Sequence, residues 1–157
     1  MTVALVRVDD RLVHGQVVVG WGRPLRAAFV VVVDDALAAS EWEQELYRMG
    51  MPPEMALEFA TVAESATRRA VWESDPRPGM ILLGDIPTAT ALAQAGVRFP
   101  RLNLGGVHHR PGRTERLPYV FLTDDEVVAL EGLAASGVEV TAQDVPTTDP
   151  VPLRELR

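Results

Sequence analysis

Two residue types with strong chemistry are absent from this sequence of 157 residues. There is no cysteine, which excludes disulfides, thiolate nucleophiles and zinc sites built on cysteine. There is no lysine either, because all 15 basic residues are arginine, so a Schiff-base lysine and a P-loop lysine are excluded. Nucleophiles of these two kinds therefore play no part in the function.

Long apolar runs and an excess of positive charge are also missing. No apolar run approaches the roughly 20 residues that a membrane-spanning helix needs, and the amino terminus shows no secretory signal pattern. We therefore expect no direct membrane span and a cytoplasmic location. The net charge of −7 argues against general binding to nucleic acid, because there is no basic excess to neutralise phosphates.

Apolar segments rich in β-branched residues alternate along the chain with segments of helical character. We expect strands at 2–8, 27–33, 55–61, 80–83, 102–107, 117–122 and 138–142. We expect helices at 15–25, 36–49, 62–73, 86–95 and 123–136, and an extended C-terminal tail at 143–157. This order predicts an α/β fold with an open, mainly parallel β-sheet and helices on both faces, in a single domain covering 1–157.

The densest group of polar residues lies between the first strand and the first helix. It reads Arg7-Val8-Asp9-Asp10-Arg11-Leu12-Val13-His14-Gly15-Gln16. In open α/β sheets, ligands bind at the carboxyl ends of the strands, which is where this stretch falls. His14 is therefore the candidate working residue, although a surface turn whose charges simply pair with one another is the alternative interpretation.

The residue types around His14 suit covalent phosphoryl transfer. An imidazole can attack a phosphoryl group when one ring nitrogen is free and an acceptor holds the other. Asp9 or Asp10 could orient the imidazole or an arginine. The groups expected to bind a phosphoryl dianion are Arg7, Arg11 and the backbone amides of Gly15 and Gln16.

A second polar loop follows the strand predicted at 102–107. Its candidate residues are Asn103, His108, His109, Arg110 and Arg113, and they face His14 if the two strands are neighbours. The alternative is a basic loop that only solvates the rim of the sheet. A zinc site made by the three histidines is disfavoured, because adjacent residues in extended backbone point to opposite sides and no HExxH spacing is present.

Several other motifs have ordinary structural explanations. The glycines at 20 and 22 lack the third glycine of GxGxxG, and neither a GxSxG nor a Walker A sequence occurs. The three tryptophans are expected in the core or at an interface. The acidic stretches Asp34-Asp35 and Asp124-Asp125-Glu126 are expected to cap helices.

The stretch from Arg7 to Val17, with Trp21 downstream, resembles the phosphorylation-site signature of IIB components in the mannose/fructose/sorbose family of the bacterial sugar phosphotransferase system. The resemblance continues in Val32-Val33-Asp34-Asp35, in Asn103-Leu104-Gly105-Gly106 and from Val138 to Pro146. It implies an open parallel sheet, the activity of a protein-Npi-phosphohistidine–sugar phosphotransferase, and no cofactor or metal.

The resemblance also implies roles and partners. His14 would accept a phosphoryl group from a phosphorylated IIA protein and pass it to a sugar bound by the membrane components IIC and IID, and the chain would form a homo-oligomer. The expected catalytic residues are His14, Arg11 and Asp10. The expected binding residues are Arg7, Asp9, Gly15, Gln16, Asn103, His108 and Arg113. The alternative is an orphan regulatory phosphorelay or interaction module without sugar transport. The sequence does not identify the sugar.

Overall fold

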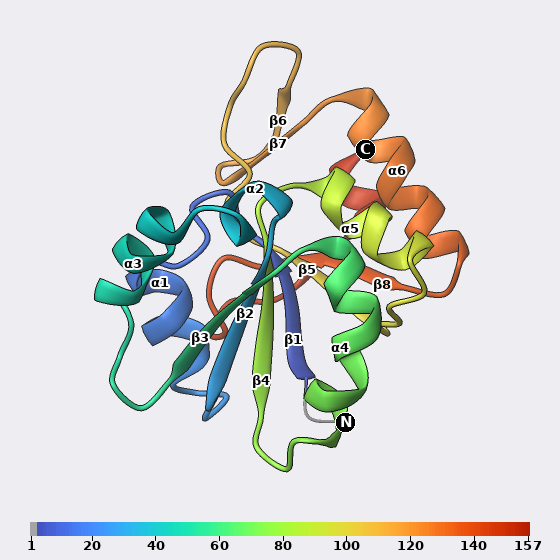
Figure 1. The fold of residues 1–157 in the computed structure, drawn as a ribbon. Helices are drawn as coiled ribbons and strands as arrows, with labels where there is room; N and C mark the ends of the chain where they lie inside the picture. Colours follow the sequence, from blue (N-terminus) through green and yellow to red (C-terminus); the bar gives the residue numbers. More distant parts are fainter. Residues whose placement is uncertain (1–2) are drawn as a thin grey trace.

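Seven strands form the main sheet of the computed structural model, which describes residues 3–157 (Figure 1). They lie in the order β3-β2-β4-β1-β5-β8-β9. Their bounds are β1 (Val3–Val8), β2 (Phe29–Val33), β3 (Ala56–Ala60), β4 (Gly79–Leu83), β5 (Arg101–Leu104), β8 (Glu139–Ala142) and β9 (Val151–Pro152). Every pair is parallel except β8 and β9, which confirms the predicted α/β fold.

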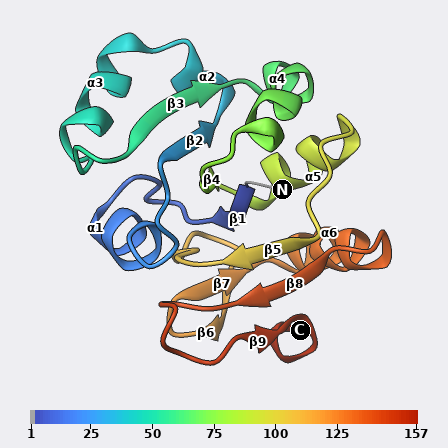
Figure 2. The ribbon, with the colours of Figure 1, turned by 90° about the horizontal axis from the view of Figure 1, so that it is seen from below.

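Helices cover both faces of this sheet (Figure 2). One face carries α1 (Gly15–Val17), its π-helical continuation η1 (Val18–Gly22), α2 (Asp35–Ala38) and α3 (Glu41–Met49). The other face carries α4 (Val62–Ser74), α5 (Ile86–Gln94) and α6 (Asp124–Ala135). A short 3-10 helix, η2 (Leu153–Leu156), follows β9.

Strand β2 shows why a continuous apolar run becomes a central strand here. All five of its residues are buried. Phe29, Val31 and Val33 join the core under α4, α5 and α6, while Val30 and Val32 join the core under α1. Because side chains alternate between the faces of a strand, only a strand covered on both sides can bury such a run.

The two acidic stretches cap helices, as expected. The Asp34 carboxylate accepts a hydrogen bond from the Leu37 N–H at the start of α2. Thr123 and Glu126 form a reciprocal capping box at the start of α6. These contacts satisfy backbone N–H groups that have no partner within the helix.

Two predicted helices were wrong in extent. The helix expected at 15–25 ends at Gly22, because Gly20 and Gly22 weaken it and Pro24 follows. The helix expected at 36–49 is divided into α2 and α3. The Gln44 side chain donates to the Leu37 and Ala38 carbonyls, which satisfies acceptors that a continuous helix would have used.

Three predicted extended segments also differ from the structure. The strand expected at 102–107 ends at Leu104, and the strand expected at 117–122 is part of a hairpin, β6 (Thr114–Leu117) with β7 (Val120–Leu122). The tail at 143–157 is not extended throughout, because β9 pairs with β8 and η2 buries Leu153 and Leu156. Thr2 lies outside the described residues.

Two of the three tryptophans are buried as expected, and the third is not. Trp21 and Trp72 belong to the two cores. Trp42 is 68% exposed and shares an outward face of α3 with the exposed Leu46 and Met49. Helix α3 contains no buried residue, so its apolar face does not contribute to the core.

The connections around β1 create the position of the site. The chain leaves β1 towards α1 on one face, whereas it leaves the neighbouring β4 and β5 towards α5 and α6 on the other face. Divergent connections leave a crevice at the carboxyl ends of the strands, where ligands of open α/β sheets bind. Among residues 3–157, no helix has both the length and the apolar character needed to cross a membrane.

Candidate active site

The loop from Asp9 to His14 leaves β1 at this crevice and turns sharply. The Leu12 N–H donates to the Asp9 carbonyl at 2.9 Å, and Leu12 has a φ of 55° although it is not glycine. This left-handed conformation costs about 1–3 kcal/mol for such a residue, so the surrounding packing must hold it. Leu12 is buried in the core under α1, which provides that packing.

His14 stands at the N-cap of α1 with an imidazole that is only partly exposed. Its Nδ1 lies 2.9 Å from the Leu12 carbonyl oxygen, and its side chain is 20% exposed. The carbonyl can only accept, so Nδ1 carries the proton and the Nε2 lone pair is free in the neutral ring. Nε2 is buried without a hydrogen-bond partner, 4.0 Å from an Asp9 oxygen. The ring must therefore turn before Nε2 can reach an external ligand.

Asp9 is a fully buried carboxylate below this ring. Its Oδ2 lies 3.5 Å from Arg7 Nη2 and accepts from the Gly106 N–H at 3.2 Å. Its Oδ1 lies 3.5 Å from Arg11 Nε and accepts from the Arg11 N–H at 3.2 Å. Because both oxygens are occupied by protein groups, Asp9 holds the loop together and is not available to bind a ligand.

Arg7 is also fully buried and connects three segments of the chain. Its guanidinium donates to the Asn103 side chain and, at 2.8 and 3.1 Å, to the carbonyls of Gln143 and Asp144. Burial lowers the pKa of Arg7, and the nearby Asp9 and Asp144 carboxylates oppose that shift. Arg7 and Asn103 were expected to bind the phosphoryl group, but the structure gives both of them internal partners.

The glycine at position 105 is required by this buried arginine. A Cβ atom there would overlap the Arg7 guanidinium, so the backbone of the second loop can pass Arg7 only as glycine. The Arg7 guanidinium also lies over the Trp21 ring, 4.9 Å from its centroid. The arginine is thus enclosed by an aromatic ring, a carboxylate and backbone oxygens, which are the partners that a buried guanidinium needs.

The second loop lies directly against the first, as expected. The Asp10 N–H donates to the Gly106 carbonyl at 2.8 Å, and the Gly105 N–H donates to the Val8 carbonyl at 2.7 Å. Asp10 accepts from the His108 N–H at 2.7 Å through Oδ2, and its Oδ1 lies 2.6 Å from His108 Nδ1. The two loops are therefore one continuous structure.

The adjacent histidines of the second loop point to different neighbours, as their extended backbone predicted. His108 faces Asp10, whereas the His109 ring meets the Phe121 ring edge to face with centroids 5.8 Å apart. The two side chains therefore serve different parts of the structure.

Arg113 was expected to bind the phosphoryl group, but it has protein partners. It donates two parallel hydrogen bonds of 2.9 Å to Glu126 and a third to the His108 carbonyl. Burial raises the pKa of Glu126, but the hydrogen bonds from Arg113 and the Thr123 N–H outweigh it, and the pKa is lowered overall. Arg113 thus anchors the second loop to α6.

In the first loop, the Arg11 guanidinium and the start of α1 remain accessible, and Arg110 of the second loop is also exposed. The Arg11 side chain is 42% exposed and donates to the Gln16 side chain at 3.2 Å. Gln16 in turn donates to Asp144 at 2.5 Å. The N–H groups of Gly15 and Gln16 lie in the first turn of α1, where helix geometry provides no intrahelical acceptor.

Sequence reasoning missed one segment of the site, the loop after β8. Asp144 accepts from Gln16, and its carbonyl accepts from Arg7 and from the Trp21 indole N–H at 3.1 Å. A signal was present, because Asp144 follows the carboxyl end of a strand in the same sheet, as Asn103 does. The positive φ of Leu12 had no comparable signal, because nothing in the residues around it indicates a left-handed conformation.

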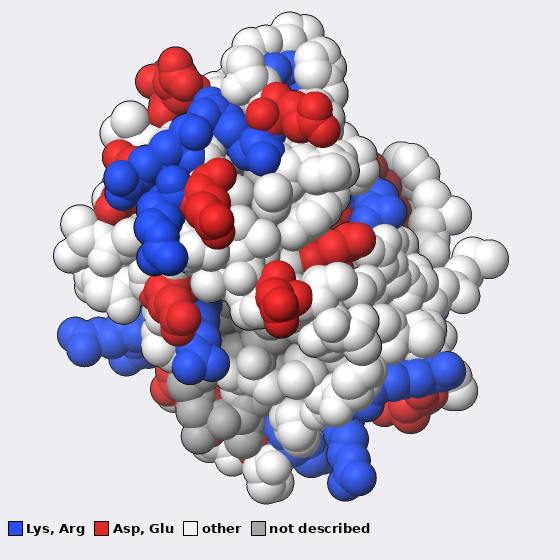
Figure 3. Space-filling view, turned by 180° about the vertical axis from the view of Figure 1, so that it is seen from behind, with Lys and Arg blue, Asp and Glu red and all other residues white. Residues whose placement is uncertain are grey.

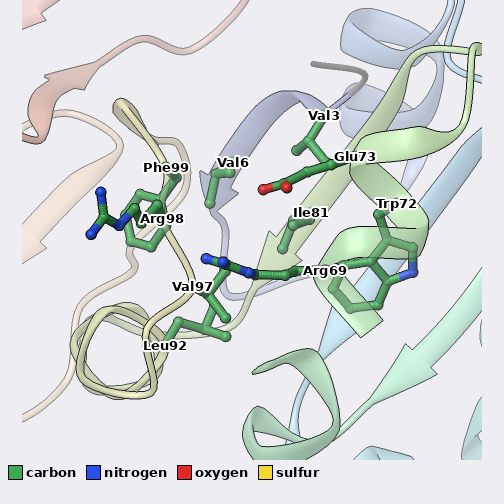
Figure 4. A pocket seen from close by; sticks show the side chains of 10 residues that line it. All are labelled: Val3, Val6, Arg69, Trp72, Glu73, Ile81, Leu92, Val97, Arg98 and Phe99. Atoms are coloured by element: carbon green, nitrogen blue, oxygen red, sulfur yellow. The ribbon is translucent and has the colours of Figure 1, made fainter. Parts of the chain in front are cut away.

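Hollows of about 580 and 610 Å³ open elsewhere on the described surface. The residues that line the first include Trp21, Asn103 and Gln143, and those that line the second include Phe99, Pro100 and Val138. A cavity of about 20 Å³ between α4 and α5 is lined by residues that include Trp72, Leu92 and Phe99 (Figure 4). That volume holds one or two water molecules, and the cavity lies in the core opposite α1. On the face shown in Figure 3, arginines gather in one band at the upper left with acidic side chains beside it, and most of the rest of the face is uncharged.

Comparison with known proteins places this geometry in a family. The chain matches the family model described as "PTS system sorbose subfamily IIB component" over residues 3–156. It is similar to the N-acetylgalactosamine-specific phosphotransferase enzyme IIB component 1 of Escherichia coli K12, with 32% identity over 148 residues that cover 92% of this chain and 91% of the relative. It is also similar to the mannose-specific EIIAB component of that organism, with 30% identity over 96% of this chain and 46% of the relative.

Solved structures agree with this result. The crystal structure of manxB from Thermoanaerobacter tengcongensis has 30% identity and a TM-score of 0.89, and the match covers 98% of this chain and 93% of that chain. The IIBSor domain of the sorbose permease from Klebsiella pneumoniae has 25% identity and a TM-score of 0.90, with 99% and 96% covered. The chain therefore belongs to the sorbose subfamily of IIB components of the sugar phosphotransferase system.

Proposed function

We propose that this chain is a cytoplasmic phosphocarrier that accepts a phosphoryl group on His14 from a phosphorylated IIA protein. It then transfers the group to a sugar bound by the membrane components IIC and IID during uptake. The overall activity is that of a protein-Npi-phosphohistidine–sugar phosphotransferase. The single observation that carries this proposal is the His14 imidazole, partly exposed at the crevice beside β1 and oriented by the Leu12 carbonyl.

The chemistry requires one bond to be exchanged for another. As the P–N bond of the donor histidine breaks, a P–N bond to His14 forms. In the second step the P–N bond of His14 breaks as the oxygen of a sugar hydroxyl binds phosphorus, and the proton of that hydroxyl is released to solvent. His14 must be neutral to act as the nucleophile, and its hydrogen bond to the Leu12 carbonyl fixes the tautomer of the neutral ring, with the proton on Nδ1 and the lone pair on Nε2. Turning of the ring then exposes a nitrogen to the donor.

Arg11 and the first turn of α1 are the proposed ligands of the transferred group. Arg11 is the exposed cation closest in the chain to His14, and its guanidinium offers donors arranged to match phosphoryl oxygens. The Gly15 and Gln16 amides add donors at a helix start, where partial positive charge favours an anion. Asp9, Arg7 and Asn103 act from below by fixing the loop that carries these groups.

The proposed donor is a separate IIA protein. One relative of this chain is named as an EIIAB component, and this chain matches 46% of it. The proposed acceptor is a sugar held by membrane components, because the relatives are named for particular sugars. In this proposal, those membrane components determine which sugar receives the phosphoryl group.

The test is a transfer assay with a purified, radiolabelled phosphorylated IIA protein of the mannose type. We expect label to move to this chain and to be lost in acid while it persists in base, as a phosphohistidine behaves. Membranes containing IIC and IID should then move the label to a sugar. Label that survives acid, or no label on a chain shown to be folded, would rule out this function.

Replacing Arg11 by alanine is expected to slow transfer to His14 while the fold is retained. Hydrogen bonds to charged groups contribute about 1.5–3 kcal/mol, which corresponds to a roughly ten- to hundredfold slower reaction. Stopped transfer reactions measure the rate, and thermal unfolding checks the fold. Arg23→Ala is the matched control, since Arg23 is also exposed but pairs with Glu54. Equal rates for the two variants would show that Arg11 is only a surface charge.

A further inference from the structure

We propose that Asp10 and His108 form a second functional pair in this site, in which Asp10 positions His108 and the His108 Nε2 atom contacts the phosphoryl group on His14. This inference rests on the proposed function and adds a further residue that touches the transferred group. It follows from three observations: the orientation of the His108 ring, the space that the ring borders, and the independence of the loop from that ring.

Both carboxylate oxygens of Asp10 contact His108, which lies 98 positions away in the sequence. Oδ2 accepts from the His108 backbone N–H at 2.7 Å, and Oδ1 lies 2.6 Å from Nδ1 of the same residue. A carboxylate can only accept, so Nδ1 is the protonated nitrogen and Nε2 is the one left for another partner. His108 is 53% exposed, so a ligand can reach that nitrogen.

The His108 ring borders the same space as the Arg11 guanidinium. A Cβ atom built on Gly106 would lie 3.1 Å from His108 Cε1, 3.2 Å from Asp9 Oδ1 and 3.4 Å from Arg11 Nη2, so these three side chains meet closely beside that glycine. Cε1 is bonded to Nε2, so the unpaired edge of the imidazole lies near the Arg11 guanidinium. The side chains of His108 and Arg11 are 53% and 42% exposed, and two such donor groups side by side suit a phosphoryl dianion at the surface of the site.

The loop does not depend on this ring for its position. Hydrogen bonds from the Gly105, Gly106 and Asp10 N–H groups already join the two loops. Arg113 holds the His108 carbonyl from the side of α6. The His108 imidazole is therefore not needed to hold the loop in place, which favours a role in binding a ligand.

The role follows from the charges that face the ring. These are Asp10 at Nδ1, Arg11 and Asp9 beside Gly106, and Arg113, which donates to the His108 carbonyl. In the neutral ring Nε2 carries a lone pair, which repels phosphoryl oxygens, so the contact requires a proton on Nε2. A dianion on one side and Asp10 on the other stabilise that imidazolium. His108 thus takes up one proton from solvent when His14 is phosphorylated and releases it when the group leaves, and it forms no bond to phosphorus.

The first test uses phosphoramidate, a small-molecule phosphoryl donor, so that it does not depend on any partner protein. We expect His108→Ala to form phospho-His14 about tenfold more slowly or worse than the wild type, because a hydrogen bond to a charged group is lost. His108→Gln keeps an N–H donor and should recover part of the rate. His109→Ala is the matched control and should react like the wild type, because its ring contacts Phe121 instead.

The second measurement distinguishes contact between His108 and the phosphoryl group from a merely structural role of His108. In ¹⁵N NMR spectra, the Nε2 resonance of His108 should shift towards the protonated value when His14 is phosphorylated. The shift should shrink in Asp10→Asn and should not occur in His14→Ala. If wild-type His14 is labelled, but His108→Ala reacts at the wild-type rate or the resonance does not move, this inference fails while the proposed function stands. If wild-type His14 takes no label from either phosphoramidate or the IIA protein, both fail.

Discussion

Replacing His14 by alanine is expected to remove all acid-labile phosphate from this chain. In the proposed relay the phosphoryl group is bonded to the His14 ring itself. His108 is held on Asp10 with a different orientation, and His109 packs on Phe121. The expected effect is therefore loss of transfer below detection, both from a phosphorylated IIA protein and from phosphoramidate.

The fold of this variant should survive, which makes the result interpretable. The side chain of His14 makes one hydrogen bond, to the Leu12 carbonyl, and its Nε2 has no partner. Loss of such a bond costs about 1 kcal/mol, which a folded domain tolerates. Thermal unfolding of wild type, His14→Ala and His109→Ala gives the comparison. Equal labelling of wild type and His14→Ala would mean that the acceptor is another residue.

Replacing Arg7 by alanine is expected to destabilise the fold strongly, although the sequence pattern predicted that Arg7 binds the phosphoryl group. The substitution leaves the buried Asp9 carboxylate without one of its two arginines, removes the Arg7 donor from the Asn103 side chain and the Gln143 carbonyl, and leaves the Asp144 carbonyl with the Trp21 indole N–H. Breaking a buried ion pair from one side costs about 3–5 kcal/mol. The loss should appear in urea unfolding as a lower midpoint at a similar slope.

The neighbouring strand provides a matched control for this prediction. Arg101 in β5 also pairs with a carboxylate, Glu139, but its side chain is 82% exposed. Arg101→Ala should change the free energy of unfolding by less than about 0.5 kcal/mol. An Arg7→Ala variant as stable as Arg101→Ala would contradict the structural role of Arg7. Arg7→Ala is also expected to slow transfer to His14, because the loops that Arg7 ties together carry the reactive groups.

The sequence by itself determined the architecture and indicated the residue that we propose as reactive. Continuous apolar runs such as Val30 to Val33 can be buried only in a strand covered on both faces, and their alternation with helices fixes a mainly parallel sheet. The carboxyl ends of such strands meet at one edge, so the polar stretch around His14 and the loop after Asn103 were expected at the same edge, and the pairing of β1 with β5 brings them together. These conclusions depend on local patterns and on general rules of topology, both of which one sequence contains.

Only the tertiary structure decided which charged residues face a ligand and which face each other. Arg7 and Arg11 are equivalent in a charge pattern, yet Arg7 points into the sheet beside Trp21 and Arg11 points to the crevice. Arg113 pairs with Glu126 and Gln16 with Asp144, across separations of 13 and 128 residues. Such pairings depend on side-chain direction, on a left-handed turn at Leu12 and on contacts between distant loops. A linear pattern does not contain them, because they arise only when the strands have been placed side by side.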